Sequence, residues 1–153
     1  MRATHPKVAS RPRALLRLLA HPAEAWLAAR VVGWMVSLPL LKRILPLQRL
    51  VRLMWRPPRD SERDRAREER TIALVSRLTR ASGGNCLERS LILYRYLGRA
   101  GAEPRLVVGM ARPDEYLGHV WVVVDDRALL EIMETLRGYE VVATFGDEGR
   151  RVE

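Results

Sequence analysis

The stretch that decides the fold is residues 83–97, GGNCLERSLILYRYL. Leu87, Leu91 and Tyr94 recur at the spacing of one helical face, so the stretch predicts an amphipathic helix. Asn85 is a favoured N-cap residue, and the two glycines before it allow the chain to turn into a helix. Cys86 is therefore predicted to be the first residue of this helix.

Cys86 is the only cysteine of the chain. At a helix start, free backbone N–H groups and the positive end of the helix dipole favour thiolate over thiol, which suits a nucleophile. A free cysteine is also a common core residue, so an inert structural role remains open. One cysteine excludes an intrachain disulfide framework and a cysteine-rich zinc site, and the chemistry of a thiol nucleophile needs no metal and no cofactor.

Positive charge is concentrated at the front of the 153-residue chain. Residues 1–59 carry twelve Lys and Arg against one acid, Glu24, for +11, whereas residues 60–153 carry fifteen Arg against seventeen acids, for −2. We therefore divide the chain into a basic N-terminal region, 1–59, and a catalytic domain, 60–153. Because a nucleic-acid-binding fold would carry basic residues within its folded core, nucleic acid is not expected as a partner.

The basic region is predicted to be helical. Apolar stripes predict helices over residues 13–30 (with a break at 20–21), 22–38 and 47–54, interrupted by Pro39 and Pro46. These helices either cover the core of the domain or present a basic amphipathic surface to an acidic membrane or a partner protein. The uncharged run 31–41 is too short to span a bilayer, and no cleavage site follows it, so we expect a cytoplasmic protein with access to the membrane surface.

The rest of the chain changes from helical to strand periodicity. The mixed-charge run 60–70, capped by Asp60 or Ser61, begins a helix that ends at 82–84. Strands are predicted over 105–110, 118–124, 128–133 and 139–145, with a loop over 111–117, a hairpin turn at 125–127 and a charged tail over 146–153. Helices followed by an antiparallel meander indicate an α+β fold.

His119 is the one histidine inside a predicted strand. A thiolate nucleophile needs such a base, and the base needs an acid to orient it. Counting the faces of the predicted hairpin places Glu131 on the side of His119 and leaves Asp125 and Asp126 in or beside the turn. We therefore prefer Glu131 as the acid, although a one-residue bulge would change the assignment.

Three segments together resemble a known family: residues 85–91 (NCLERSL), 106–110 (LVVGM) and 118–122 (GHVWV). They look like the transglutaminase-like cysteine proteases of lasso-peptide biosynthesis, the B proteins or leader peptidases. The resemblance covers residues 60–145 and implies a papain-like or transglutaminase-like core, with the nucleophile at the start of a helix packed on an antiparallel sheet.

The resemblance also implies residue roles. Cys86 would be the nucleophile, His119 the proton acceptor and Glu131 the orienting acid, at a position where the family usually has Asp. Arg89 and Trp121 are weaker candidates for substrate contact, since a salt bridge for Arg89 and core packing for Trp121 are at least as expected.

The implied reaction is removal of the leader from a ribosomally made lasso-peptide precursor. The implied partners are the precursor peptide, a separate leader-recognition protein and an ATP-dependent lasso cyclase, which the basic helices could dock. Two alternatives remain open. One is an amidotransferase of the same fold, in which an amine rather than water takes the acyl group. The other is a non-catalytic adaptor or membrane-surface module.

Overall fold

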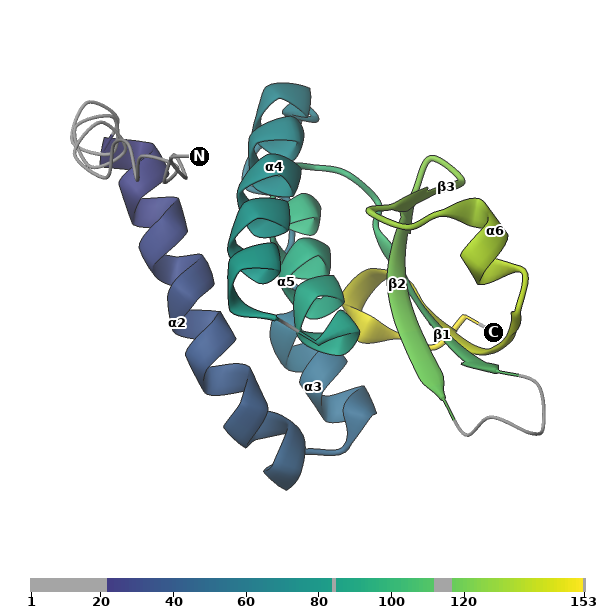
Figure 1. Ribbon diagram of the computed structural model, residues 1–153. Coiled ribbons are helices and arrows are strands. Elements are labelled where there is room, and N and C mark those ends of the chain that lie inside the picture. The colour runs from purple at the N-terminus through teal and green to yellow at the C-terminus, as the bar shows by residue number, and fades with distance from the viewer. Residues whose placement is uncertain (1–21, 84, 112–116, 153) are drawn as a thin grey trace, which may run out of the picture.

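Helices and an antiparallel sheet form the two halves of the computed structural model (Figure 1), which describes residues 22–83, 85–111 and 117–152. The helices are α2 (Pro22–Ile44), α3 (Leu47–Met54), α4 (Arg65–Ser82), α5 (Cys86–Arg99), the short α6 (Met133–Leu136) and the 3-10 helix η1 (Asp147–Gly149). The strands are β1 (Arg105–Ala111), β2 (Gly118–Val124), β3 (Arg127–Leu129) and β4 (Tyr139–Phe145). The predicted α+β fold is confirmed.

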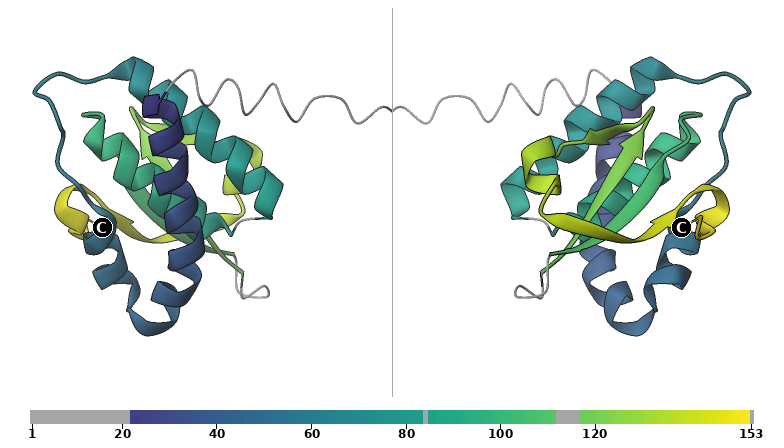
Figure 2. Two further views of the ribbon diagram at one scale, coloured as in Figure 1. Left: turned by 90° about the vertical axis from the view of Figure 1, so that its left-hand side faces the viewer. Right: turned by 90° about the vertical axis from the view of Figure 1, so that its right-hand side faces the viewer.

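The central element is α5. Residues 90–98 of this helix are all buried, because α4, α2 and α3 pack on it from one side and β2 and β1 from the other. The two views of Figure 2 show α2 crossing the helical side of the molecule and the sheet on the opposite side. The helix begins at Cys86 as predicted, with the Asn85 side chain accepting a hydrogen bond from the Leu87 N–H at 2.9 Å.

The sheet has the strand order β3-β2-β1-β4, and every neighbouring pair is antiparallel. β2 and β3 form a hairpin whose two turn residues, Asp125 and Asp126, both have positive φ. The residues of β1 and β2 alternate between the side that faces α5 and the opposite side. Leu106 and Val122 pair across the two strands and are fully buried.

The prediction that Pro39 interrupts the helix was wrong. α2 runs for 23 residues through Pro39, although a proline in a helix interior costs about 3 kcal/mol or more. Val31 and Leu38 are fully buried in the common core, and we attribute the continuity of the helix to this packing. The predicted tail 1–12, the predicted helical segment 13–20, its break at 20–21 and most of the predicted loop 111–117 lie outside the described residues.

By length and composition alone, α2 is long and apolar enough to cross a membrane. The prediction considered only the uncharged run 31–41 within this helix, which is too short to span a bilayer. The apolar residues of α2 are divided between two faces. Val31 and Leu38 are buried in the core, while Val36 (74 % exposed) and Ile44 (68 % exposed) face outward. The helix thus contributes to the core of this structure and still presents an apolar outer face.

Two predicted boundaries were displaced by tertiary contacts. α4 begins at Arg65 with Asp64 as its cap, rather than after Asp60 or Ser61. The residue before the cap, Arg63, forms ion pairs with Glu68 at 2.5 Å and with Asp125 at 2.9 Å. These contacts tie the segment before α4 to the hairpin turn, which explains why the helix starts later than its charge pattern suggested.

The predicted charged tail is also folded. η1 follows β4, and Arg151 forms a β-bridge with Phe145. Gly149 has a φ of 64°, and a Cβ there would lie 2.8 Å from the Arg52 backbone nitrogen of α3, so only glycine fits without displacement. The division of the chain at residue 59 remains a prediction, while α2 and α3 share one buried core with α5.

Candidate active site

Cys86 lies at the N-terminus of α5 and is partly exposed. Its thiol is 3.6 Å from Asn85 Oδ1, which also caps the Leu87 N–H. Because Oδ1 is only an acceptor, this contact holds the sulfur as a thiol donor. The Leu87 N–H is used by this cap and the Arg89 N–H donates to the Asn85 carbonyl oxygen at 3.1 Å. The N–H groups of Cys86 and Glu88 have no acceptor within the helix, so they are available to a negatively charged group beside the sulfur.

His119 and Glu131 are joined directly. His119 Nε2 lies 3.0 Å from Glu131 Oε2, and the two side chains are 17 % and 9 % exposed. A carboxylate accepts a hydrogen bond, so Nε2 is the donor in this contact, and in the neutral form of the ring Nδ1 carries the free lone pair. Among the described residues, Nδ1 has no hydrogen-bond partner. The ring is therefore oriented through Nε2, while Nδ1 makes no hydrogen bond within the described part of the chain.

The observed register of the sheet shows that the count of strand faces by which we chose Glu131 was wrong. Val122 pairs with Leu129 and Val124 with Arg127, so an unbroken ladder would place Ile132, not Glu131, opposite His119. β3 instead ends at Leu129, earlier than the predicted strand over 128–133, and Leu130 has a φ of 59°. This left-handed residue turns the chain out of the sheet and brings the Glu131 carboxylate to the imidazole.

Two contacts connect the Cys86 helix to the surroundings of His119, one through Glu131 and one directly to the His119 strand. Arg89 donates from Nη2 to Glu131 Oε1, and Ser90 Oγ donates to the Val120 carbonyl oxygen at 2.8 Å. Arg89 and Ser90 lie one turn after Cys86, and Val120 adjoins His119. Within the described part of the chain, the sulfur and the imidazole are not hydrogen-bonded to each other. The helix start and the ring are nonetheless held on adjoining elements.

Residues 28–144 match the family described as the transglutaminase-like superfamily, which is more than half of the chain. The chain belongs to the transglutaminase-like superfamily. This superfamily contains cysteine proteases and transferases. No match was found among curated proteins or among solved structures.

In this transglutaminase-like protein the imidazole lies within an aromatic group formed by His119, Trp121 and Tyr139. The Trp121 ring stacks near the His119 ring at 5.8 Å and 23°, and the Tyr139 ring lies 5.2 Å from it. The indole is only 6 % exposed. Trp121 is thus buried beside the ring, outside the core cluster to which Val120 and Val122 belong, whereas its substrate contact remains a prediction.

Gly109 makes room for this aromatic group. It lies on β1 between β2 and β4, and it pairs with His119. A Cβ at this position would lie 2.8 Å from Cζ3 of Trp121 and 3.0 Å from Cβ of Tyr139. Sequence reasoning missed both Gly109 and Tyr139. The available signal was a glycine in a strand interior, which often marks a close approach by another group.

The other sequence candidates lie elsewhere or have other partners. Asp125 pairs with Arg63 at 2.9 Å, and Asp126 pairs with Arg105, so neither approaches the imidazole as Glu131 does. Arg89 is occupied with Glu131, and its role toward substrate remains a prediction. The described residues contain no group of three or more His, Cys, Asp or Glu side chains able to hold a metal ion.

Proposed function

We propose that this member of the transglutaminase-like superfamily is a cysteine peptidase that removes the leader from a ribosomally made lasso-peptide precursor. The observation that carries the catalytic part is the 3.0 Å contact between His119 Nε2 and Glu131 Oε2, which leaves Nδ1 as the basic nitrogen. The precursor and its class are inferred from the sequence resemblance at residues 85–91, 106–110 and 118–122.

The proposed reaction begins when His119 Nδ1 takes the proton of Cys86. The thiolate attacks the scissile carbonyl carbon, and backbone N–H groups at the start of α5 stabilise the oxyanion that forms. The imidazolium then protonates the leaving nitrogen, which releases the core peptide with a free amine and leaves the leader as a thioester on sulfur. Water, activated by the same imidazole, hydrolyses the thioester and restores Cys86.

Approach of the thiol to Nδ1 requires the S–H to leave Asn85 Oδ1. Rotation about the Cys86 side chain would release the S–H, while Asn85 stays in place because its Oδ1 also accepts from the Leu87 N–H at 2.9 Å. Glu131 keeps the ring oriented during proton transfer, and Arg89 keeps Glu131 oriented in turn. In this mechanism Glu131 and Arg89 are positioning residues.

The partners in this proposal are a separate leader-recognition protein and an ATP-dependent cyclase that uses the freed amine. The proposed location is the cytoplasm, where the precursor is made, with contact to the membrane surface through the basic N-terminal helices. The concentration of positive charge in residues 1–59 and the exposed apolar face of α2 support docking by this region.

The decisive experiment incubates the full-length protein with a precursor peptide encoded beside its gene and with the neighbouring leader-binding protein. Mass spectrometry follows the released leader and core. We expect cleavage by the wild type, none by Cys86→Ala or His119→Ala, and normal cleavage by the control Asp126→Asn, which alters an exposed ion pair.

Each other outcome has a defined meaning. A leader that gains an added amine instead of a free carboxylate would identify the amidotransferase. Full biosynthetic function with Cys86→Ala would identify a non-catalytic adaptor. Either result would overturn the peptidase proposal.

A further inference from the structure

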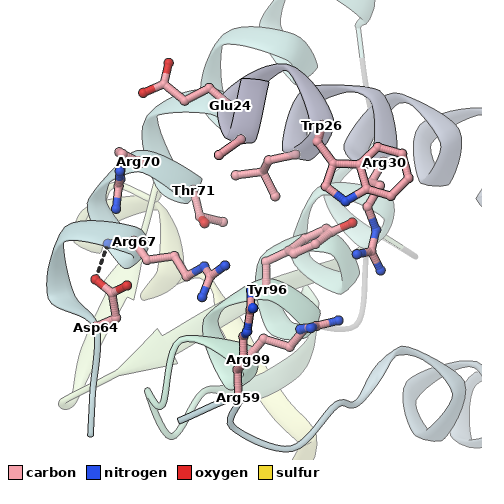
Figure 3. A pocket seen from close by; sticks show the side chains of 12 residues that line it. Glu24, Trp26, Arg30, Arg59, Asp64, Arg67, Arg70, Thr71, Tyr96 and Arg99 are labelled. Atoms are coloured by element: carbon pink, nitrogen blue, oxygen red, sulfur yellow. Dashed lines mark hydrogen bonds between the residues drawn. The ribbon is translucent and has the colours of Figure 1, made fainter. Parts of the chain in front are cut away.

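A second polar site lies at the end of the helical layer away from Cys86 (Figure 3). A cavity of about 320 Å³ is enclosed by α2, the segment before α4, α4 itself and the last turn of α5. Its wall includes the five arginines Arg30, Arg59, Arg67, Arg70 and Arg99. Since Arg99 is thirteen residues after Cys86 on the same helix, the site is about 20 Å from the sulfur along the helix axis.

The arginines of this pocket lack a matching negative charge. In the described part of the chain, none of the five guanidinium groups forms an ion pair. The two acids that line the pocket are Glu24 and Asp64, and the Asp64 carboxylate is used to cap α4. Residues 1–21, which precede α2, contain no Asp or Glu and supply no acidic side chain.

The arginines also repel one another. Burial lowers the pKa of Arg99, and the nearby charges of Arg30, Arg67 and Arg59 lower it further. Like charges gathered in a partly buried site destabilise the empty protein. An anion bound among them would remove this repulsion, so the arrangement favours an occupied site over an empty one.

Two buried hydroxyl groups in the same wall have no hydrogen-bond partner among the described residues. Thr71 is 1 % exposed and Tyr96 is 5 % exposed, and Thr71 Oγ1 and Tyr96 Oη make no hydrogen bond to any described residue. Figure 3 shows both side chains among the arginines that line the pocket. A buried hydroxyl without a partner costs about 1–3 kcal/mol, and a ligand with several acceptor oxygens could offer one to each hydroxyl.

The ligand class follows from these groups. Five guanidinium groups and two hydroxyl donors offer more positive charge and more donors than one carboxylate uses, whereas a phosphoryl group has three acceptor oxygens and a charge of about −1.5 to −2. Ala23, Trp26 and Leu27 form an apolar part of the wall. We propose that the pocket binds a phosphorylated organic ligand, with its phosphoryl group among the arginines and its apolar part against Trp26.

Two sources share this chemistry. A soluble nucleotide would place its base on the indole of Trp26, which is 66 % exposed. An anionic phospholipid would place its headgroup in the pocket and its chains along α2, where exposed Leu40 and Ile44 lie on the same helical face as Trp26. The phosphoryl site is the same in both cases, so the experiment contains an arm for each source.

The test measures binding to the full chain by calorimetry with pyrophosphate and with ATP, and by co-sedimentation with phosphatidylcholine vesicles that either contain or lack phosphatidylglycerol. We expect binding to at least one phosphate probe. We expect the double variant Arg67→Gln/Arg99→Gln to bind that probe at least about tenfold more weakly, because charge-assisted hydrogen bonds are lost.

The matched control is Arg77→Gln. Arg77 is an exposed residue of the same helix as Arg67 and does not line the pocket. Comparison of Arg77→Gln with the single variants Arg67→Gln and Arg99→Gln, which lose the same one charge, tests the effect of lost net charge alone. The affinity of Arg77→Gln should remain close to that of the wild type. Cys86→Ala should bind normally, which separates this site from the proposed peptidase activity.

Tyr96→Phe is a second variant of the pocket, chosen so that weaker binding cannot be explained by a folding defect. Removal of a hydroxyl without a partner should leave the thermal stability of the empty protein unchanged or raised, while binding of the probe becomes weaker. Equal weakening by Arg77→Gln and by the pocket variants would overturn the proposal in favour of non-specific attraction. Failure of every phosphate probe to bind, or stronger binding of a glutamate-rich peptide, would overturn it as well.

Discussion

At the scale of single residues, the position of the His119 ring depends on Gly109, which carries no side chain. Replacement of Gly109 by alanine would place a Cβ 2.8 Å from Trp121, so the indole and the neighbouring imidazole must move. We expect Gly109→Ala to slow precursor cleavage about tenfold or more and to destabilise the fold by about 1–3 kcal/mol. Cleavage kinetics and thermal unfolding measure the two effects.

Gly33→Ala is the control for this variant. A Cβ at Gly33 meets nothing within 4 Å, and alanine favours a helix over glycine by about 1 kcal/mol. This substitution should raise the thermal stability and leave cleavage unchanged. Normal cleavage by Gly109→Ala would show that the aromatic group does not position the imidazole.

Glu131 provides the second prediction at this scale. Glu131→Gln removes the charge that His119 Nε2 and Arg89 share, so the imidazole loses the carboxylate that orients it. We expect alkylation of Cys86 by iodoacetamide at neutral pH to slow by about tenfold or more. Asp126→Asn changes an acid that is 91 % exposed and should alkylate as the wild type does; equal rates in all three proteins would argue against coupling between Cys86 and Glu131.

At the scale of elements, Tyr94 joins α5 to the C-terminal turn. Its hydroxyl donates to the Gly146 carbonyl oxygen and accepts from the Gly149 N–H at 3.1 Å, and the side chain is fully buried. Tyr94→Phe leaves both backbone groups without this partner. We expect a loss of about 1–3 kcal/mol in the free energy of unfolding, measured by urea denaturation at neutral pH.

The same residue predicts a pH dependence. Burial raises the pKa of Tyr94 to about 12, and the nearby Asp147 charge adds to the effect, whereas the unfolded side chain titrates near pH 10. The folded state therefore holds its proton longer, and the contribution of Tyr94 to stability is complete below about pH 10 and is lost between about pH 10 and 12. Tyr94→Phe should show a shallower fall in stability across this window; an unchanged slope would contradict the assignment.

The elements show where sequence reasoning succeeded. The start of α5 follows from local rules, because Asn85 caps its own helix, and β1, β2 and β4 follow from β-branched runs. Glu131 was selected with the wrong register and reaches His119 through the positive φ of Leu130, which no residue type signals. The start of α4 depends on long-range ion pairs of Arg63, and such contacts cannot be read from neighbouring residues.

At the scale of the whole molecule, α2 runs antiparallel to α5 and contacts both of its ends. Near its start, Trp26 and Arg30 line the same pocket as Tyr96 and Arg99, and near its end Lys42 pairs with Glu88 at 2.7 Å in the first turn of α5. The pocket could not be predicted from sequence, because its arginines come from separate segments that only the folded chain brings together.

This arrangement predicts one cooperative unit. Leu38 of α2 is fully buried in the same core as Leu93 of α5, so Leu38→Ala should lower the free energy of the single unfolding transition by about 2–5 kcal/mol. Val36→Ala, at a position 74 % exposed, should change it by less than about 0.5 kcal/mol. Calorimetry with two separate transitions, and Leu38→Ala affecting only one, would instead show that residues 1–59 form an independent domain.

The partly exposed position of Cys86 has a practical outcome for anyone who handles the protein. No second thiol exists in the chain, so oxidation to a disulfide can only link the sulfur to another molecule, giving a covalent dimer or a small-thiol adduct. Purification in air would therefore abolish the proposed peptidase activity without unfolding the protein, and a reducing agent would restore it. Counting free sulfhydryls before and after reduction would report directly the fraction of competent molecules.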